Sequence, residues 1–156
     1  MKRVLSFICM AALLCGCEVH EDTLFDIPYT YISDASGQSS MVVDNSLDNL
    51  LTELVLHLDM SAERFTEPVT VSLDIIVGDG LKEGVDFRIQ ASSKGPVTFV
   101  PGVYSMPVRV IWMRHELDPS KDNSLTFSIS GCSYEGMTLG LPGPDSLNKS
   151  FKFTKK

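Results

Sequence analysis

Residues 68–113 read PVTVSLDIIVGDGLKEGVDFRIQASSKGPVTFVPGVYSMPVRVIWM, and this stretch decides the fold. Within it, short apolar runs alternate with turn-forming sequences such as Gly78-Asp79-Gly80 and Pro101-Gly102. The clearest run is 69–77, where apolar side chains recur at every second position. Period two places successive side chains on opposite faces of an extended strand, and no run keeps the spacing of a helix. The stretch therefore predicts the core of a β-sheet.

The same alternation recurs on both sides of this stretch. Strands are expected at 27–32, 50–60, 69–77, 85–89, 97–99, 106–113, 124–130 and 150–154. Turn signals separate the runs, and no amphipathic helical pattern of any length is present. We therefore expect an all-β protein, an antiparallel Ig-like β-sandwich of about seven to eight strands.

Three local features leave alternatives open. Met41-Val42-Val43 is either a short strand or a sheet edge, and residues 46–51 could form a short helix with a polar cap. Pro107 cannot donate a hydrogen bond to a sheet ladder. Its strand is therefore expected to begin after it, or to be an edge or a bulge at that point.

Length and charge narrow the class of protein. The chain has 156 residues and a formal net charge of −7, with 13 basic and 20 acidic residues. This length fits one domain. Nucleic-acid binding needs clustered Lys and Arg, which are absent, so no nucleic-acid partner is expected.

The N-terminal residues have the pattern of a lipoprotein signal peptide. Lys2 and Arg3 precede an apolar run over 4–14 that is too short to cross a bilayer. Leu14-Cys15-Gly16-Cys17 then resembles a bacterial lipobox with Cys17 as the lipidated residue. An ordinary secretory signal or an uncleaved anchor are the alternatives. We predict a signal peptide over 1–16, a lipidated tether over 17–26 and a β-sandwich domain over 27–156.

The residues after Cys17 bear on localisation. The sequence Glu18-Val19-His20-Glu21-Asp22 is acidic and resembles the export signal that sends lipoproteins of Bacteroidetes to the cell surface. A plain acidic tether is the alternative. We expect an outer-membrane protein, held by its lipid and exposed at the surface.

The stretch that decides the fold also resembles the middle of a Calx-beta domain. The matching segments are Gly78-Asp79-Gly80, Glu83-Gly84-Val85-Asp86-Phe87, Val97-Thr98-Phe99-Val100-Pro101-Gly102 and Met106-Pro107-Val108-Arg109-Val110. Related patterns recur in lipoproteins of Bacteroidetes, often encoded beside glycan-uptake machinery. The resemblance covers about half of the chain that follows the signal peptide, and implies a Calx-beta-like sandwich.

The resemblance fails where calcium would bind. Calx-beta domains that bind calcium carry consecutive aspartates where this chain has Arg114-His115-Glu116. Calcium takes six to eight oxygen ligands. Asp86, Glu116 and Asp118 could cluster at one end of the sandwich, but Arg114 would repel the ion. We expect structural or solvated carboxylates there, with a calcium site as the weaker alternative and no other metal.

No pattern in the chain indicates catalysis. The histidines at 20, 57 and 115 lack metal-ligand spacing, and no nucleophile motif or phosphate-binding loop is present. We therefore expect a protein that is not an enzyme and has no cofactor. His57 is expected on a solvated strand face, and Cys132 is expected to be a small buried side chain.

Aromatic residues suggest where a ligand could bind. Trp112 shares a strand face with Val108 and Val110, so it is expected in the core. Tyr104 and Tyr134 lie in loops or at edges and are the candidate ligand contacts. The first functional hypothesis is an accessory glycan-binding or adhesion module. The second is an assembly subunit that binds an envelope protein through a sheet edge, and the third is a calcium-stabilised module.

Overall fold

The computed structural model describes residues 27–59 and 65–156, and the chain is all-β over this range. The strands are β1 (Tyr29–Ser33), β2 (Ser40–Val43), β3 (Leu50–Asp59), β4 (Val69–Val77), β5 (Phe87–Ile89), β6 (Val97–Phe99), β7 (Ser105–Trp112), β8 (Ser124–Cys132), β9 (Thr138–Leu139) and β10 (Ser150–Lys155). A single turn of 3₁₀-helix, η1 (Ala91–Ser93), joins β5 to β6. The predicted all-β class is confirmed.

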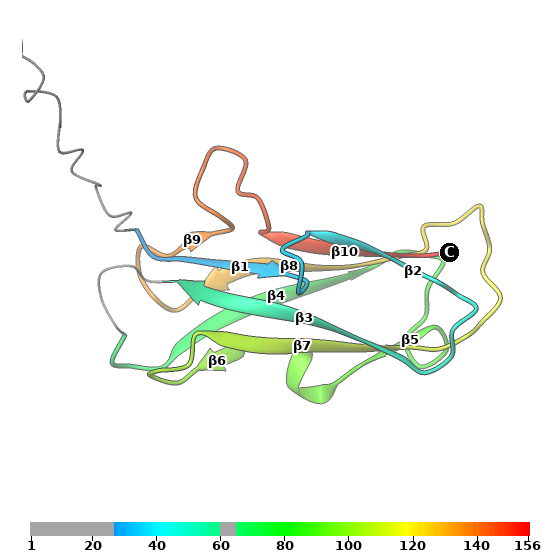
Figure 1. Cartoon of the computed structure of the whole chain (residues 1–156), viewed down its shortest axis with the longest axis horizontal. Helices are drawn as coiled ribbons and strands as arrows, with labels where there is room; N and C mark the ends of the chain where they lie inside the picture. The colour runs from blue at the N-terminus through cyan, green and yellow to red at the C-terminus, as the bar shows by residue number, and fades with distance from the viewer. Residues whose placement is uncertain (1–26, 60–64) are drawn as a thin grey trace, which may run out of the picture.

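The strands form two five-stranded sheets that face each other across the core (Figure 1). One sheet has the order β5-β7-β3-β1-β9 and is called sheet A. The other has the order β2-β10-β8-β4-β6 and is called sheet B. Each sheet is thus built from strands far apart in the sequence, because consecutive strands repeatedly change sheet.

Two edge pairings differ from the antiparallel arrangement that was predicted. β9 runs parallel to β1, and β2 runs parallel to β10. Parallel neighbours cannot be joined by a tight hairpin, and both pairs are indeed far apart along the chain. The expected strand number is also too low, because β9 was missed. Residues 41–43 form part of β2, which is a short strand and lies at the border of sheet B, so both alternatives for that run hold.

The connection between β2 and β3, residues 44–49, contains no helix. Residues 45–46 form a turn and 48–49 a bend, and Asn49 has a positive φ of 56° that ends any helical course before β3 begins at Leu50. The short helix considered over 46–51 is therefore wrong. Asp44 accepts a hydrogen bond from the Ser46 backbone N–H, which favours a turn over a helix.

Pro107 lies inside β7, opposite Val55 of β3. The neighbouring Leu58 N–H donates to Tyr104 O, so hydrogen-bonded pairs alternate along this ladder and Pro107 falls on a pair without hydrogen bonds. The Pro107 nitrogen, which carries no hydrogen, therefore faces away from β3. On that side β5 pairs only with residues 110–112 of β7. The edge alternative is confirmed: the strand begins before Pro107, at a point where it has one neighbour.

The core is built from the inward faces of both sheets. In β3 the buried side chains Leu54, Leu56 and Leu58 alternate with more exposed ones, as period two requires. Trp112 is fully buried and packs edge-on against Phe153 with ring centroids 5.2 Å apart. Its indole Nε1–H donates to Thr52 Oγ1 at 2.9 Å. The prediction that Trp112 belongs to the core is confirmed.

The two termini of the described domain lie at opposite ends of its long axis. β1 begins at one end, together with the end of β3 and the start of β4, whereas the C-terminus lies at the other (Figure 1). We call these the β1 end and the C-terminal end. Residues 1–26, which include Cys17, the predicted signal peptide and the tether, lie outside the described residues. In the part that is described, no helix is long and apolar enough to cross a membrane.

Candidate functional site

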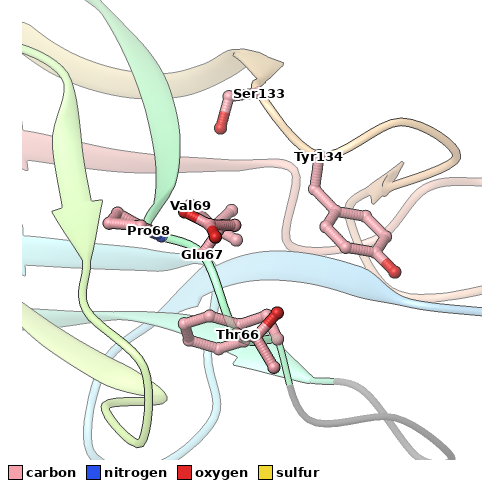
Figure 2. Close-up of a pocket in the computed structure, with 7 residues that line it drawn as sticks. Thr66, Glu67, Pro68, Val69, Ser133 and Tyr134 are labelled. Atoms are coloured by element: carbon pink, nitrogen blue, oxygen red, sulfur yellow. The ribbon is translucent and has the colours of Figure 1, made fainter.

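A small pocket at the β1 end contains one of the two predicted ligand-binding tyrosines. Its volume is about 230 Å³, and it is lined by Phe65, Thr66, Glu67, Pro68, Val69, Ser133 and Tyr134 (Figure 2). Tyr134 is half-buried and extends beside the start of β4. Ligand pockets usually have volumes of about 300–1,000 Å³. The pocket is therefore below the usual range of volumes.

Tyr104 does not line this pocket but contacts its wall. Its ring meets Phe65 edge-on, with centroids 5.2 Å apart and an interplanar angle of 69°. Phe65 is only 5 % exposed and belongs to the core. The two predicted tyrosines are thus brought to the same end of the domain, with Phe65 as their common neighbour, and Tyr104 serves to cover the core.

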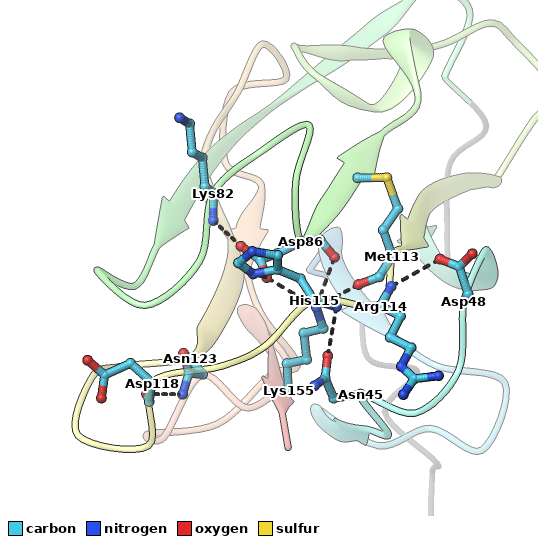
Figure 3. Close-up of polar contacts among 10 residues, drawn as sticks. All are labelled: Asn45, Asp48, Lys82, Asp86, Met113, Arg114, His115, Asp118, Asn123 and Lys155. Carbon is cyan, nitrogen blue, oxygen red and sulfur yellow. Dashed lines mark hydrogen bonds and ion pairs between the residues drawn. The ribbon is translucent and has the colours of Figure 1, made fainter.

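The C-terminal end carries a buried charged pair that the sequence reasoning missed. Lys155 Nζ lies 3.2 Å from Asp86 Oδ1 and also donates to Met113 O at 2.7 Å (Figure 3). Asp86 also accepts a hydrogen bond from the Lys82 backbone N–H, and His115 Nδ1 lies 3.3 Å from its Oδ1. These contacts join Lys155 of β10 to Asp86, which lies just before β5, and to Met113, which lies just after β7.

This arrangement bears on the calcium candidates. The Asp86 carboxylate is already paired with the ammonium group of Lys155, which lies where a calcium ion would have to bind. Asp118 is exposed and accepts hydrogen bonds from the backbone N–H and hydroxyl of Ser120, which lower the pKa of Asp118. Within the described ranges, no three His, Cys, Asp or Glu side chains are grouped so that they could hold a metal ion. Glu116 lines open depressions at this end, beside Asn45.

The outer face of sheet A carries a strip of three aromatic rings, which we call the aromatic strip: Tyr29, Tyr31 and His57. Tyr31 lies opposite His57 in the β1–β3 register, and their rings stack with centroids 4.4 Å apart and an interplanar angle of 12°. Tyr29 continues the strip, with its centroid 5.9 Å from that of Tyr31. All three side chains are half-buried, so part of each ring faces solvent.

Polar groups surround the strip. Ser33 Oγ lies 3.4 Å from His57 Nε2, and Ser105 Oγ lies 3.4 Å from His57 Nδ1. Tyr29 donates its hydroxyl proton to Asp59 Oδ2 at 2.8 Å, and burial together with this carboxylate raises the pKa of Tyr29 to about 12. Burial lowers the pKa of His57, with Asp59 opposing the shift. The imidazole is therefore mostly neutral at pH 7. His57 lies on the outer strand face, as predicted, but is only partly exposed to solvent.

Sheet B has an unpaired edge along part of β4. The Gly78 N–H donates to Ser124 O, so the backbone groups of Ile76 and Asp74 point toward β8 and those of Leu73, Ile75 and Val77 point the other way. On that other side β6 pairs only with Val69, Thr70 and Val71. We call residues 73–77 the open half of β4. Ile76 is 58 % exposed and Val77 is 42 % exposed.

Cys132 ends β8 and is a half-buried free thiol. Burial raises its pKa, which opposes formation of the reactive thiolate. Cys132 is therefore only partly buried, less than was expected, and its thiol is poorly reactive.

A signal for Lys155 was present in the sequence. Phe151, Phe153 and Lys155 share one face at period two, and two buried phenylalanines place the lysine on the inward side. The aromatic strip had a weaker signal: Tyr29 and Tyr31 share a strand face, but the partner strand and its register were needed to add His57.

Comparison with known proteins adds no assignment. No model of a protein family matches the chain, and no curated protein matches it.

Proposed function

We propose that this chain is a lipid-anchored, non-enzymatic module of the outer-membrane surface that binds a glycan through the aromatic strip. The observation that carries the proposal is the stack of Tyr31 on His57, continued by Tyr29, on the outer face of sheet A. Sugars present apolar C–H faces that stack on aromatic rings, and hydroxyl groups that exchange hydrogen bonds. The strip offers both kinds of contact on one surface.

The chemistry of the strip suits a neutral sugar. The lowered pKa of His57 leaves its imidazole uncharged, with one nitrogen that donates and one that accepts. The exposed Ser105 hydroxyl lies beside the ring, the buried Ser33 hydroxyl holds the ring in place, and the Asp59 carboxylate lies at the Tyr29 end. A surface with this mixture recognises hydroxyl groups without requiring a charged ligand.

The anchor and the strip are compatible in space. Lipid on Cys17 would hold the β1 end nearest the membrane, because the tether over 17–26 can span at most about 35 Å. The strip runs along the side of the domain near this end, and the loops of the C-terminal end face outward. Several acyl chains on one cysteine give stable attachment, since each buried CH₂ contributes about 0.8 kcal/mol.

The finer fold assignment belongs to the same proposal. We infer a Calx-beta-like, Ig-like arrangement of the two sheets from the motifs at Gly84 and Gly102. Both glycines have positive φ values, 84° and 89°, which glycine adopts without strain. Their turns lie next to β5 and β6 as the motifs imply.

The test is a glycan array probed with the purified full-length chain, followed by calorimetry on any glycan that binds. Tyr31→Ala should abolish binding, because it removes the central ring of the strip, whereas Tyr134→Ala should leave binding unchanged. Loss with Tyr134→Ala alone would move the site to the pocket at the β1 end. An array without any bound glycan would remove the proposal.

The anchor is tested separately, by metabolic labelling with a palmitate analogue. Label on the chain should disappear in the Cys17→Ala variant. Label that survives this substitution would contradict Cys17 as the modified residue, and protease treatment of intact cells distinguishes the outer surface from the inner leaflet.

A second candidate function is assembly with a protein partner through a sheet edge. The open half of β4 favours it, because unpaired backbone groups and exposed Ile76 and Val77 are what a further strand would cover. Affinity purification from detergent-solubilised outer membrane should then recover a stoichiometric partner, and Ile76→Lys should release it. Recovery of the chain alone would count against this function.

A further inference from the structure

The two sheets end in four short strands, β5 and β9 in sheet A and β2 and β6 in sheet B, which have two to four residues each. Outside β1, the backbone of residues 138–148 takes its free hydrogen-bonding groups, and outside β10 residues 39–45 do the same. Along β7, Pro107 lacks an N–H, and the Arg109 backbone pairs with Ser93 and Gln90. Such devices prevent edge-to-edge association.

Beyond the end of β6, the open half of β4 has none of these features. There Leu73, Ile75 and Val77 direct their backbone groups outward, and no described strand, proline or returning loop is paired with them. The charged Asp74 lies on the outer face of the sheet rather than along the edge. Unpaired backbone groups beside exposed apolar side chains are a template for a further strand.

We propose that the open half of β4 pairs antiparallel with the same segment of a second copy of this chain, about a two-fold axis at Ile75. This proposal rests on the second candidate function, assembly with a protein partner, and it identifies the partner as another copy of the chain. In this register Ile75 exchanges both backbone hydrogen bonds with its counterpart, and Leu73 pairs with Val77 of the other copy. Sheet B then continues across the pair.

The side chains of the segment suit pairing with themselves. On the inner face, every opposed pair is apolar, because Leu73, Ile75 and Val77 meet only one another. On the outer face, Asp74 lies opposite Ile76 of the other copy, so no carboxylate directly faces a carboxylate. The two Asp74 side chains are diagonal neighbours, whose separation in such ladders is about 7–8 Å. Exposed charges at that distance repel weakly and are screened by salt.

The register permits a test by disulfide cross-linking. Asp74 and Ile76 of the other copy form a pair without hydrogen bonds, in which Cα atoms lie about 4.5 Å apart. That separation suits a disulfide, which requires about 4.4–6.8 Å. The diagonal pair Asp74 with Asp74 is too far apart for one.

The experiment co-expresses two full-length chains that carry different tags, one with Asp74→Cys and the other with Ile76→Cys, and treats intact cells with a mild oxidant. A mixed disulfide dimer is expected from this combination. Two controls should give no cross-linked product. In the first, both tagged chains carry the same cysteine substitution. In the second, both chains keep Asp74 and Ile76 and contain only their original cysteines.

A second variant tests the backbone pairing. Ile75→Pro removes an N–H that points to the open side and leaves the β8 side of the ladder intact, so mixed dimer should be lost while the melting temperature is retained. If Ile75→Pro unfolds the chain, Asp74→Lys replaces it. Asp74→Lys chains should pair with original chains more readily than with themselves, and this preference should fade at high salt.

The outcomes separate this proposal from the function on which it rests. Equal cross-linking in all cysteine combinations would indicate random collision and overturn the pairing. A cross-link to a chain of different mass would overturn the second copy as occupant while supporting assembly with another protein. If neither cross-link forms, both the pairing of two copies and the assembly function are refuted. The glycan proposal depends on other residues, so the glycan array tests it independently.

Discussion

Lys155 and Asp86 form an ion pair inside the domain, with Nζ and Oδ1 3.2 Å apart and side chains that are 0 % and 3 % exposed. The ammonium also meets two backbone carbonyls, those of Asp86 and Met113. Its three protons thus have acceptors, as a buried charge requires. The pair joins the last strand to two connections that are distant in the sequence.

Removing one partner of this pair should strongly destabilise the protein. Lys155→Met leaves the buried Asp86 carboxylate without its main counter-charge, and we expect the free energy of unfolding to fall by about 3–5 kcal/mol. Urea denaturation measures it. Lys152→Met, at an exposed position on the same strand, is the control and should change stability by less than about 0.5 kcal/mol. Adding Asp86→Asn to Lys155→Met should recover part of the loss; no recovery would show that packing, not charge, dominates.

His57 should make stability depend on pH. Burial lowers its pKa below the usual 6.5, so between the two values the unfolded chain binds more protons than the folded protein. Its contribution to stability is therefore present above about pH 6.5 and declines as the pH falls through that value. His57→Phe keeps a ring beside Tyr31 but cannot titrate. The melting temperature of the original chain should fall relative to that of His57→Phe on acidification, and parallel curves would contradict a titrating His57.

Gly78 should not tolerate a side chain. A Cβ there would lie 2.1 Å from the Asp122 backbone oxygen, where the turn after β4 meets the connection before β8. Gly78→Ala should cost about 1–3 kcal/mol of unfolding free energy through this overlap. Gly95→Ala is the matched control, because a Cβ at that position would have nothing within 4 Å and the residue has no positive φ. Equal stability of the two variants would show that the two connections separate easily.

Cys132 should react slowly with alkylating reagents in the folded protein. Burial raises the pKa of its thiol, so little thiolate is present near pH 7. Peptide-level mass spectrometry after brief maleimide treatment should find little label on Cys132 in buffer and extensive label in urea. Rapid labelling of the folded chain would indicate that the end of β8 opens.

The strands could be predicted because each depends on its own sequence. Period two in β3, β4 and β8 is set by which side chains face the core, and those positions were found within one or a few residues. The strand neighbours could not be predicted, because pairing depends on where the chain returns after long connections. The parallel pairing of β2 with β10 is an example.

The candidate sites show the same division. Tyr104 and Tyr134 were recognisable as aromatic residues outside the regular strands, yet their position beside Phe65 depends on three connections that meet at one end. Tyr31 and His57 are joined only by the register of β1 with β3. Asp86 was considered for calcium, and its lysine partner, at the end of the last strand, could be found only once the strands were assembled.

The opposite placement of the two termini determines how far apart two paired copies would be attached. An antiparallel pair about Ile75 reverses one domain relative to the other and joins the two copies near their C-terminal ends, so the two β1 ends lie at opposite extremes of the pair. Val69, at the start of β4, is six residues from the axis in each copy, so the two β1 ends would be separated by about 40 Å along the strand direction. Tethers attached to the two β1 ends would leave the pair in opposite directions. With a lipid anchor at each β1 end, such a pair would bridge two facing membranes. Two copies on one membrane could form it only by lying on their sides, with the sheets parallel to the lipid surface.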